Sequence, residues 1–218
     1  MLIIKRQAQS LRIAGQSITE FLIAWPLLLL AICLLVQLLW LWWAQQTLAT
    51  ATQYAVRAGA INHGNLRHMR TTLITAMAGI KPQIEKDKAV TAAAKAVALQ
   101  TAHYVLYGKI NVVQPTAKQF KQFAERRWDT DNKRYVREIA VDHYHARQSA
   151  DERPAWAAAR RLKIETHWCE DLKLPLIAEF LGAIAKSRGQ CLVGNLNDRP
   201  QWPLRSQAEH ELLSGYRR

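Results

Sequence analysis

Residues 15–44 read GQSITEFLIAWPLLLLAICLLVQLLWLWWA, and this stretch decides how the chain is organised. From Phe21 to Ala44 there are 24 consecutive residues without a charge. As a helix this run rises about 36 Å, which is enough to cross a hydrocarbon layer about 30 Å thick. Trp40, Trp42 and Trp43 gather at one end of the run, as aromatic residues do at a membrane–water boundary. The sequence therefore predicts a single membrane-spanning helix.

The charges on either side of the run predict its orientation. Lys5, Arg6 and Arg12 precede it, and the nearest base that follows is Arg57. Basic residues stay on the cytoplasmic side, so we expect a cytoplasmic N-terminus and an exported C-terminal part. An ordinary cleaved secretory signal is the alternative, and residues 49–51 (ATA) supply a small-x-small site for it. The apolar run is much longer than the roughly 7–15 residues of such a signal, which favours an anchor.

A processing motif stands directly before the apolar run. Gly15 is followed by four uncharged residues and then by Glu20 and Phe21, the arrangement that prepilin peptidases cut. Cleavage after Gly15 would remove the leader 1–15 and give Gln16 a free amino group. Because a carboxylate inside a bilayer costs a few kcal/mol, Glu20 needs a partner or a function. The amine of a neighbouring subunit would be such a partner. A signal-anchored protein whose Glu20 lies in the headgroup layer is the other interpretation.

The chain has 218 residues and a formal net charge of +13. The part beyond residue 44 is long enough for one domain with its own core. A basic exported domain can meet anionic lipid, surface polysaccharide or extracellular DNA, although a solvated basic surface has the same composition. No nucleic-acid-binding motif accompanies the charge, so nucleic acid is not an expected partner.

Beyond the apolar run the pattern stays helical as far as Gly108. Alanine-rich residues 44–61 continue the first helix until a break at residues 62–65 (NHGN). A second helix follows, with Asn65 as its N-cap and Gly79 at its end. A third begins near Pro82. The expected inner faces are Leu66, Met69, Leu73, Met77 and Ile80 in the second helix, and Val90, Ala94, Val97, Thr101 and Tyr104 in the third.

Short strands and helices are expected after residue 108. The strand candidates are 109–114, 134–144, 162–169 and 202–212. The helix candidates are a short helix capped by Thr116 that contains Phe120 and Phe123, and residues 176–187. The expected turn or loop regions are 128–133 and 149–154. Helices followed by strands predict an α+β fold, here a long transmembrane pilin-like helix, a helical segment and a small antiparallel sheet. The expected organisation is a leader at 1–15, a transmembrane helix with its periplasmic extension at 16–61, and a periplasmic α+β domain at 62–218.

Three cysteines and several closely spaced histidines are the candidates for chemistry. Cys33 lies within the apolar run, where it is expected to act as a small apolar filler. Cys169 and Cys191 are 22 residues apart in the exported part, where oxidising conditions favour a disulfide. His143, His145, His167 and Cys169 suggest a competing zinc site, because residues two apart on a strand share a face.

No recognised catalytic spacing supports that zinc site. The sequence has no HExxH, CxxC, GxSxG, P-loop or dinucleotide-binding motif. We therefore expect no enzyme activity, metal or cofactor. A membrane-tethered metalloenzyme and a tethered basic domain that binds anionic surface polymers remain the alternatives to an assembly role.

The chain resembles a known family in several places. The segment GQSITEFLIAWPLLLL and the later QQTLATATQYAVRAGAINHG resemble the N-terminal signature of TadE-like proteins, minor pilins (pseudopilins) of the tight-adherence (Tad or Flp) pilus. The matching positions are Gly15, Glu20-Phe21, Pro26 and residues 57–60 (RAGA). The pieces GKINVVQPTAKQF, RRLKIETHWCEDLKLPLI and WPLRSQAEHEL are similar to longer proteobacterial members. The basic tail 213–218 (LSGYRR) departs from the family pattern and leaves a contact at the pilus tip in doubt.

The resemblance implies a function and a set of partners. It implies processing by a dedicated prepilin peptidase after Gly15 and a role in assembling a pilus for surface adherence. The implied partners are that peptidase, other Tad minor pilins, the pilus assembly machinery and membrane lipid. The implied location is the bacterial inner membrane, crossed once, with the C-terminal domain in the periplasm and the subunit sometimes incorporated into the pilus.

Overall fold

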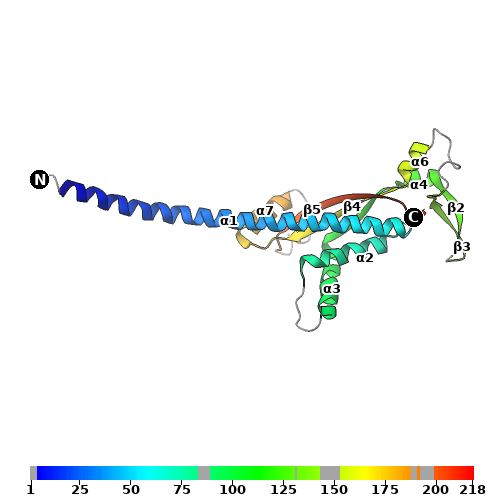
Figure 1. Ribbon diagram of the computed structural model, residues 1–218, viewed down its shortest axis with the longest axis horizontal. Helices are drawn as coiled ribbons and strands as arrows, with labels where there is room; N and C mark the ends of the chain where they lie inside the picture. The colour runs from blue at the N-terminus through cyan, green and yellow to red at the C-terminus, as the bar shows by residue number, and fades with distance from the viewer. Residues whose placement is uncertain (1–3, 83–88, 131, 143–152, 188–190, 192–198) are drawn as a thin grey trace.

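The computed structural model describes residues 4–82, 89–130, 132–142, 153–187, 191 and 199–218. The fold is α+β, with one long N-terminal helix, shorter helices and two small antiparallel sheets (Figure 1). The helices are α1 (Ile4–Ile61), α2 (Leu66–Met77), the 3-10 helix η1 (Ala78–Ile80), α3 (Ala89–Tyr107), α4 (Ala117–Phe123), α6 (Arg153–Ala159) and α7 (Pro175–Ser187). The strands are β1 (Gly108–Gln114), β2 (Ala124–Asp129), β3 (Arg134–Ile139), β4 (Arg161–Asp171), β5 (Gln201–Glu211) and β6 (Tyr216–Arg217).

The long helix α1 has two halves with different surroundings. Its N-terminal half extends away from the rest of the molecule, and its C-terminal half lies along β5 and α2 (Figure 1). On this C-terminal half, Ala44, Leu48, Ala51 and Ala55 are fully buried. Their spacing of three and four residues places them on one face, and the small alanines let other elements approach the helix axis closely. The predicted extension of the helix to Ile61 is confirmed.

The main sheet has the strand order β1-β4-β5, and both pairings are antiparallel. Strand β4 pairs with β5 along its whole length, from Arg161 opposite Glu211 to Asp171 opposite Gln201. Alternate side chains of β4 are buried: Leu162, Ile164, Thr166 and Trp168, as the alternation in the sequence predicts, and also Glu170, which was not expected inside. This face of the sheet is covered by α1, and α2 packs against α1.

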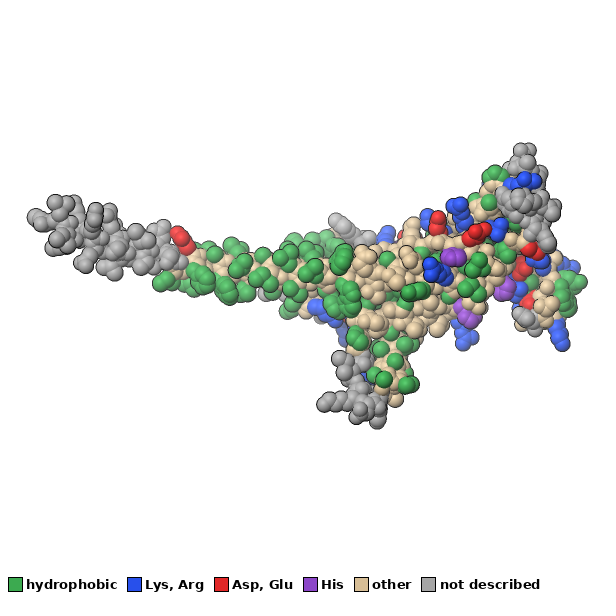
Figure 2. All heavy atoms as spheres, in the orientation of Figure 1, with side chains coloured by type: hydrophobic (Ala, Val, Ile, Leu, Met, Phe, Trp, Pro, Cys, Tyr) green, Lys and Arg blue, Asp and Glu red, His purple; other side chains and the backbone are tan. Residues whose placement is uncertain are grey.

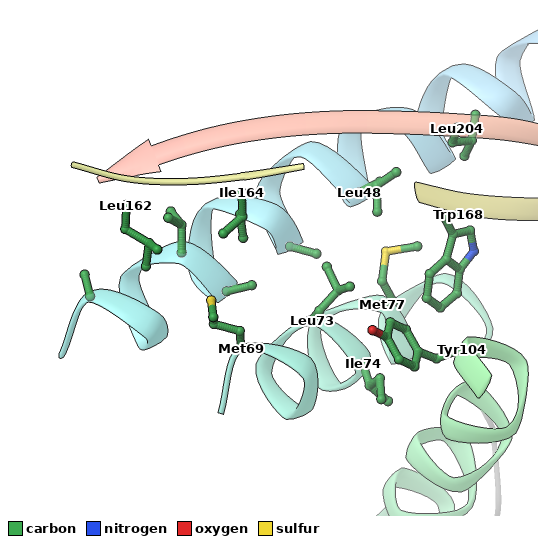
Figure 3. Close-up of a cluster of buried hydrophobic side chains, with 14 of the residues drawn as sticks. Leu48, Met69, Leu73, Ile74, Met77, Tyr104, Leu162, Ile164, Trp168 and Leu204 are labelled. Atoms are coloured by element: carbon green, nitrogen blue, oxygen red, sulfur yellow. The ribbon is translucent and has the colours of Figure 1, made fainter. Parts of the chain in front are cut away.

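The core lies between α1, α2 and the main sheet, and Tyr104 of α3 closes one end of it (Figure 3). Met69, Leu73 and Met77 of α2 are completely buried against α1 and β4. One polar contact crosses this core, where the hydroxyls of Thr52 on α1 and Thr166 on β4 lie 2.7 Å apart. That hydrogen bond satisfies both hydroxyls, which are out of contact with water.

Two glycines, Gly59 in the last turn of α1 and Gly64 just after the helix, shape the connection to α2 for different reasons. A side chain on Gly59 would overlap Met69 of α2 and Leu162 of β4, so the close packing of the two helices depends on its absence. Gly64 has a φ of 74° and faces the Tyr216 ring, and His63 before it is also left-handed, with a φ of 55°. The Gly64 N–H donates to the Gly59 carbonyl at 2.8 Å and ends the helix.

A second sheet, in the order β2-β3-β6, lies at the end of the molecule opposite the N-terminal half of α1 (Figure 1). Arg217 on β6 connects to both strands of the β2–β3 hairpin through their carboxylates. Its Nε donates to Glu138 at 2.8 Å and its Nη1 donates to Asp129 at 2.6 Å. Burial alone would lower the pKa of Arg217, but the bonds and charges of these two carboxylates raise it above its usual value.

The expected inner face of the third helix is confirmed only at Val97, which packs partly buried against the core, and at Tyr104. Val90 is 83% exposed, and Ala94 and Thr101 also face outward. The buried residues of α3 are Ala92, Ala96, Gln100 and Tyr104. In so alanine-rich a helix the apolar periodicity distinguishes the faces poorly, and contacts with α2 and β1 determine the buried one. The described part of the helix begins at Ala89.

Three local predictions also need correction. The expected turn at 128–133 is wrong at its start, because Trp128 and Asp129 belong to strand β2. Gly79 does not terminate α2; the C-cap is Ala78, and Gly79 lies inside η1. The expected loop 149–154 lies outside the described residues up to 152, and residues 153 and 154 already belong to α6. The strands predicted at 109–114, 162–169 and 202–212 and the caps Asn65 and Thr116 are confirmed.

Candidate assembly helix and its junction with the domain

The N-terminal half of α1 presents a continuous apolar surface. Figure 2 shows apolar side chains running along the helix up to the domain. Within the part of the chain that the structure describes, Phe21 is 61% exposed, Leu30 48% and Leu35 60%. The helix from Glu20 to Ile61 is long and apolar enough to cross a membrane. A helix that is apolar on every side is stable only in lipid or against other apolar helices.

The predicted processing residues lie at the start of this surface. Gly15 and Gln16 are within the continuous helical backbone of α1, and the side chain of Gln16 is outside what the structure describes. Glu20 is exposed on the first described turns of the helix. Phe21 stacks on Trp25 one turn later, with ring centroids 5.6 Å apart. Glu20 is thus the acidic residue that precedes an exposed apolar helix, as the sequence indicated.

One side of the apolar helix becomes covered at a hydrogen-bonded junction that sequence reasoning missed, whereas Leu39 and Trp42 beyond it are still exposed. The side chain of Gln37 is buried, and its Oε1 accepts from the backbone N–H groups of Lys173 and Leu174 at 3.0 and 3.2 Å. These residues lead into α7, so this amide fastens α7 to α1. Lys173 also lies over the Trp40 ring, with Nζ 5.0 Å from its centroid. The signal was present in the sequence, because Gln37 is the one amide side chain in the uncharged run.

A small apolar cluster continues this junction. Leu41 of α1 packs with Leu172 and Ala178, and Trp202 of β5 lies against them. From this level onward one face of α1 is buried by the domain. The junction therefore marks the level beyond which the domain covers one side of α1.

A polar cluster lies at the end of β4, where catalytic chemistry would be sought. Lys81 Nζ is 2.8 Å from Asp171 and 3.9 Å from the buried carboxylate of Glu170. Gln201 donates to Asp171 at 2.8 Å, and Trp168 Nε1 donates to Glu170 at 3.2 Å. These bonds connect the segment before α3 to strands β4 and β5 of the main sheet. A structural role in holding this segment against the sheet therefore explains the cluster.

Burial and charge shift the titrations in this cluster in opposite directions. Burial raises the pKa of Glu170, and the nearby Lys81 only partly offsets it. Burial would also raise the pKa of Asp171, but hydrogen bonds from Lys81 and Gln201 lower it below its ordinary value. Burial lowers the pKa of His103, whose Nε2 lies 2.8 Å from the Cys169 carbonyl.

The structure places the predicted cysteine pair together. Cys169 and Cys191 form a disulfide, with their Cα atoms 5.8 Å apart, and Cys33 is a free thiol on α1. Cys169 therefore supplies no thiolate to the suggested zinc site. His143 and His145 lie outside the described residues, and His167 Nε2 is 3.5 Å from Glu165. Within the described residues no group of three or more His, Cys, Asp or Glu side chains is arranged to hold a metal ion.

Comparison with protein families decides what the apolar helix resembles. The family model described as TadE-like protein matches residues 15–57. This N-terminal segment is TadE-like. The TadE-like segment begins at Gly15 and contains the whole exposed apolar surface, the Gln37 junction and most of the buried face of α1. Comparisons with curated proteins and with solved structures found no match. The match links the chain to the Tad pilus system and confirms the N-terminal part of the resemblance, whereas the similarity of the three later pieces stays a prediction.

Proposed function

We propose that this chain is a minor pilin (pseudopilin) that takes part in assembling a Tad pilus for surface adherence. The observation that carries the proposal is the division of α1 within a TadE-like segment. One half is exposed and apolar on all sides, and the other half is held by the domain. In the membrane the exposed half binds lipid, and in an assembly the same leucines pack against helices of other pilin subunits.

The proposed topology follows from the flanking charges. The basic leader lies in the cytoplasm, α1 crosses the bacterial inner membrane once, and the α+β domain faces the periplasm. A prepilin peptidase cuts after Gly15, so that Gln16 becomes the first residue. The chain's work in this role is packing, and no catalytic step or cofactor is assigned to it.

Glu20 gives the proposed assembly its register. The new ammonium group of Gln16 on one subunit pairs with the Glu20 carboxylate of its neighbour. In the low dielectric of the bilayer this attraction is much stronger than in water, and both charges are otherwise costly to bury. The pair therefore favours one axial position of neighbouring helices over others.

The mature N-terminus tests the processing step directly. We expect intact-mass and peptide mass spectrometry of the protein purified from cells with a working Tad system to find a chain that starts at Gln16. A chain that keeps the leader, or one cut after Ala51 as an ordinary secretory signal would be, contradicts the proposal. Cells that lack the peptidase provide the control, since the leader should remain there.

Substitution of the acid tests the pairing step. Glu20→Ala should lower the number of pili severalfold while the protein still inserts in the membrane, because only the contact between subunits is lost. Glu179→Ala removes an exposed acid from α7 and serves as the matched control. Pili counted by electron microscopy and protein recovered in the membrane fraction are the two measurements. Normal piliation with Ala at position 20 would exclude the pairing.

A further inference from the structure

The hairpin β2–β3 carries a basic and aromatic face at the end of the molecule farthest from the N-terminal half of α1 (Figure 1). Trp128 pairs with Tyr135 across the hairpin, and Arg126 pairs with Arg137. Alternate residues of a strand share a face, so these four side chains lie on one face of the sheet. All four are exposed. Figure 2 shows apolar and basic side chains side by side over this end of the molecule.

The acidic residues of strands β2 and β3 lie on the other face. Glu125, Asp129 and Glu138 alternate with the outward residues and point toward the domain, where Arg127 and Arg217 pair with them. Among the described residues, no carboxylate lies within ion-pair distance of Arg126 or Arg137. The outward face therefore carries positive charge that the described part of the chain does not neutralise.

The arginine pair is unfavourable for the isolated hairpin. Like charges placed directly opposite on neighbouring strands destabilise a sheet, whereas an aromatic cross-strand pair stabilises it. The edge-on contact of Trp128 and Tyr135, with centroids 5.0 Å apart, accounts for a well-formed hairpin. Arg126 opposite Arg137 gives the hairpin no comparable stabilisation. Two arginines placed opposite each other on neighbouring strands supply positive charge that a carboxylate, sulfate or phosphate group of a ligand would stabilise.

The aromatic side chains narrow the class of ligand. The Arg126 guanidinium lies over the Tyr135 ring, 4.2 Å from its centroid, and occupies one face of that ring. The Trp128 indole lies two residues along the strand from Arg126 and is 53% exposed, and Tyr135 is 58% exposed. The exposed indole suits the apolar face of a single sugar next to its acidic group. Binders of single-stranded nucleic acid instead offer several rings in succession for stacked bases.

We propose that this outward face, formed by Arg126, Trp128, Tyr135 and Arg137, is a binding site for an acidic polysaccharide. The indole of Trp128 packs on a sugar ring, and the paired guanidinium groups hold the negatively charged substituent of that sugar or its neighbour. This binding is independent of helix assembly, because the site lies at the opposite end of the molecule from Glu20.

The test measures binding of the full chain, solubilised in a nonionic detergent, to polygalacturonate, with fully methyl-esterified polygalacturonate as the uncharged polymer. We expect binding to the acidic polymer and none to its ester. The double variant Arg126→Gln/Arg137→Gln should weaken binding about tenfold or more, which corresponds to about 1.4 kcal/mol. The matched control Lys118→Gln/Lys121→Gln removes the same charge from exposed positions on α4 and should change affinity less than about twofold.

Two further readouts separate a built site from general charge or from structural damage. The melting temperature of Arg126→Gln/Arg137→Gln should equal or exceed that of the unsubstituted chain, because a like-charge pair is removed. Trp128→Ala should also lose polygalacturonate binding. Equal loss in both double variants, a fall in melting temperature that explains the lost binding, or no binding to polygalacturonate would overturn the proposal. Tighter binding of the oligonucleotide dT20 than of polygalacturonate, lost in the same variants, would assign the face to nucleic acid instead.

Discussion

Glu170 and Asp171 are neighbours whose carboxyl groups have opposite effects on stability. The Glu170 side chain is nearly inaccessible and its pKa is raised, so its charged form opposes folding. The pKa of Asp171 is lowered by hydrogen bonds from Lys81 and Gln201, so its charged form favours folding. Both sit at the same end of β4, which makes them a matched pair for substitution.

Glu170→Gln should raise the melting temperature at pH 7, because it removes a carboxylate whose burial disfavours the charged state. A raised pKa means that the penalty appears as pH rises past the unfolded value of about 4.5 and is complete above the folded value. The advantage of the variant should therefore shrink as pH falls and vanish below about pH 4. Thermal unfolding of the detergent-solubilised chain between pH 4 and pH 8 measures it.

Asp171→Asn provides the comparison with the opposite sign. The lowered pKa of Asp171 stabilises the folded chain above its unfolded value of 3.8, and this contribution is lost as pH falls through the folded pKa. The variant should cost about 1 kcal/mol at neutral pH, a modest value because a third of the side chain is exposed. Equal destabilisation by both substitutions at pH 7 would contradict the opposite roles of the two carboxyls.

Single residues of the candidate site differ in how well the sequence revealed them. Glu20 and Phe21 could be recognised from the neighbouring residues alone, because a single acid directly before an apolar run is visible in the sequence. The role of Gln37 depends on backbone groups 136 and 137 residues away, and no local pattern contains those partners. Arg126 and Arg137 become a pair only through the hairpin register. Because β2 carries charges on both faces, its sequence did not predict a strand, and its pairing with β3 could not be predicted either.

Among the elements, the contact of α1 with α2 depends on Gly59. Gly59→Ala should destabilise the chain by about 1–3 kcal/mol, because the added methyl group overlaps Met69 and Leu162 in a packed core. Gly79→Ala is the same substitution in η1, where nothing lies within 4 Å of the new atom. That control should be neutral or stabilising by up to about 1 kcal/mol. The melting temperatures of the two variants, measured by thermal unfolding, test this prediction. Equal stabilities would contradict close packing at Gly59.

Elements with strong local signals were predicted well from sequence. The alternation of β4 predicts its buried face because one side of that strand meets the core along its whole length. In α3 almost every position is alanine or another apolar residue, so the sequence does not distinguish the side that meets α2 from the side that meets water. Strand β2 reads AERRWD and carries charges on both faces, which resembles a turn more than a half-buried strand.

At the scale of the whole molecule, α1 performs two tasks that fall on different halves of one helix. Its C-terminal half supplies the core of the domain, and its N-terminal half supplies an apolar surface that the domain does not cover. The TadE-like segment spans both halves and ends at Arg57. A change in one half should therefore affect folding, and the same change in the other half should affect assembly.

Leu48→Ala and Leu35→Ala test this division with one substitution on one helix. Leu48 is fully buried in the core, so its truncation should cost about 2–5 kcal/mol and lower the melting temperature by many degrees. Leu35 is 60% exposed, so its truncation should leave the melting temperature nearly unchanged.

In cells we expect the opposite ranking of the two variants when the number of pili is divided by the amount of folded protein in the membrane. Leu35→Ala should form fewer pili per molecule in the membrane, because it removes packing surface between subunits, whereas the Leu48→Ala molecules that remain folded should assemble normally. Unfolding temperatures that fall equally would place both halves of α1 in one core and contradict the division that the exposed fractions describe.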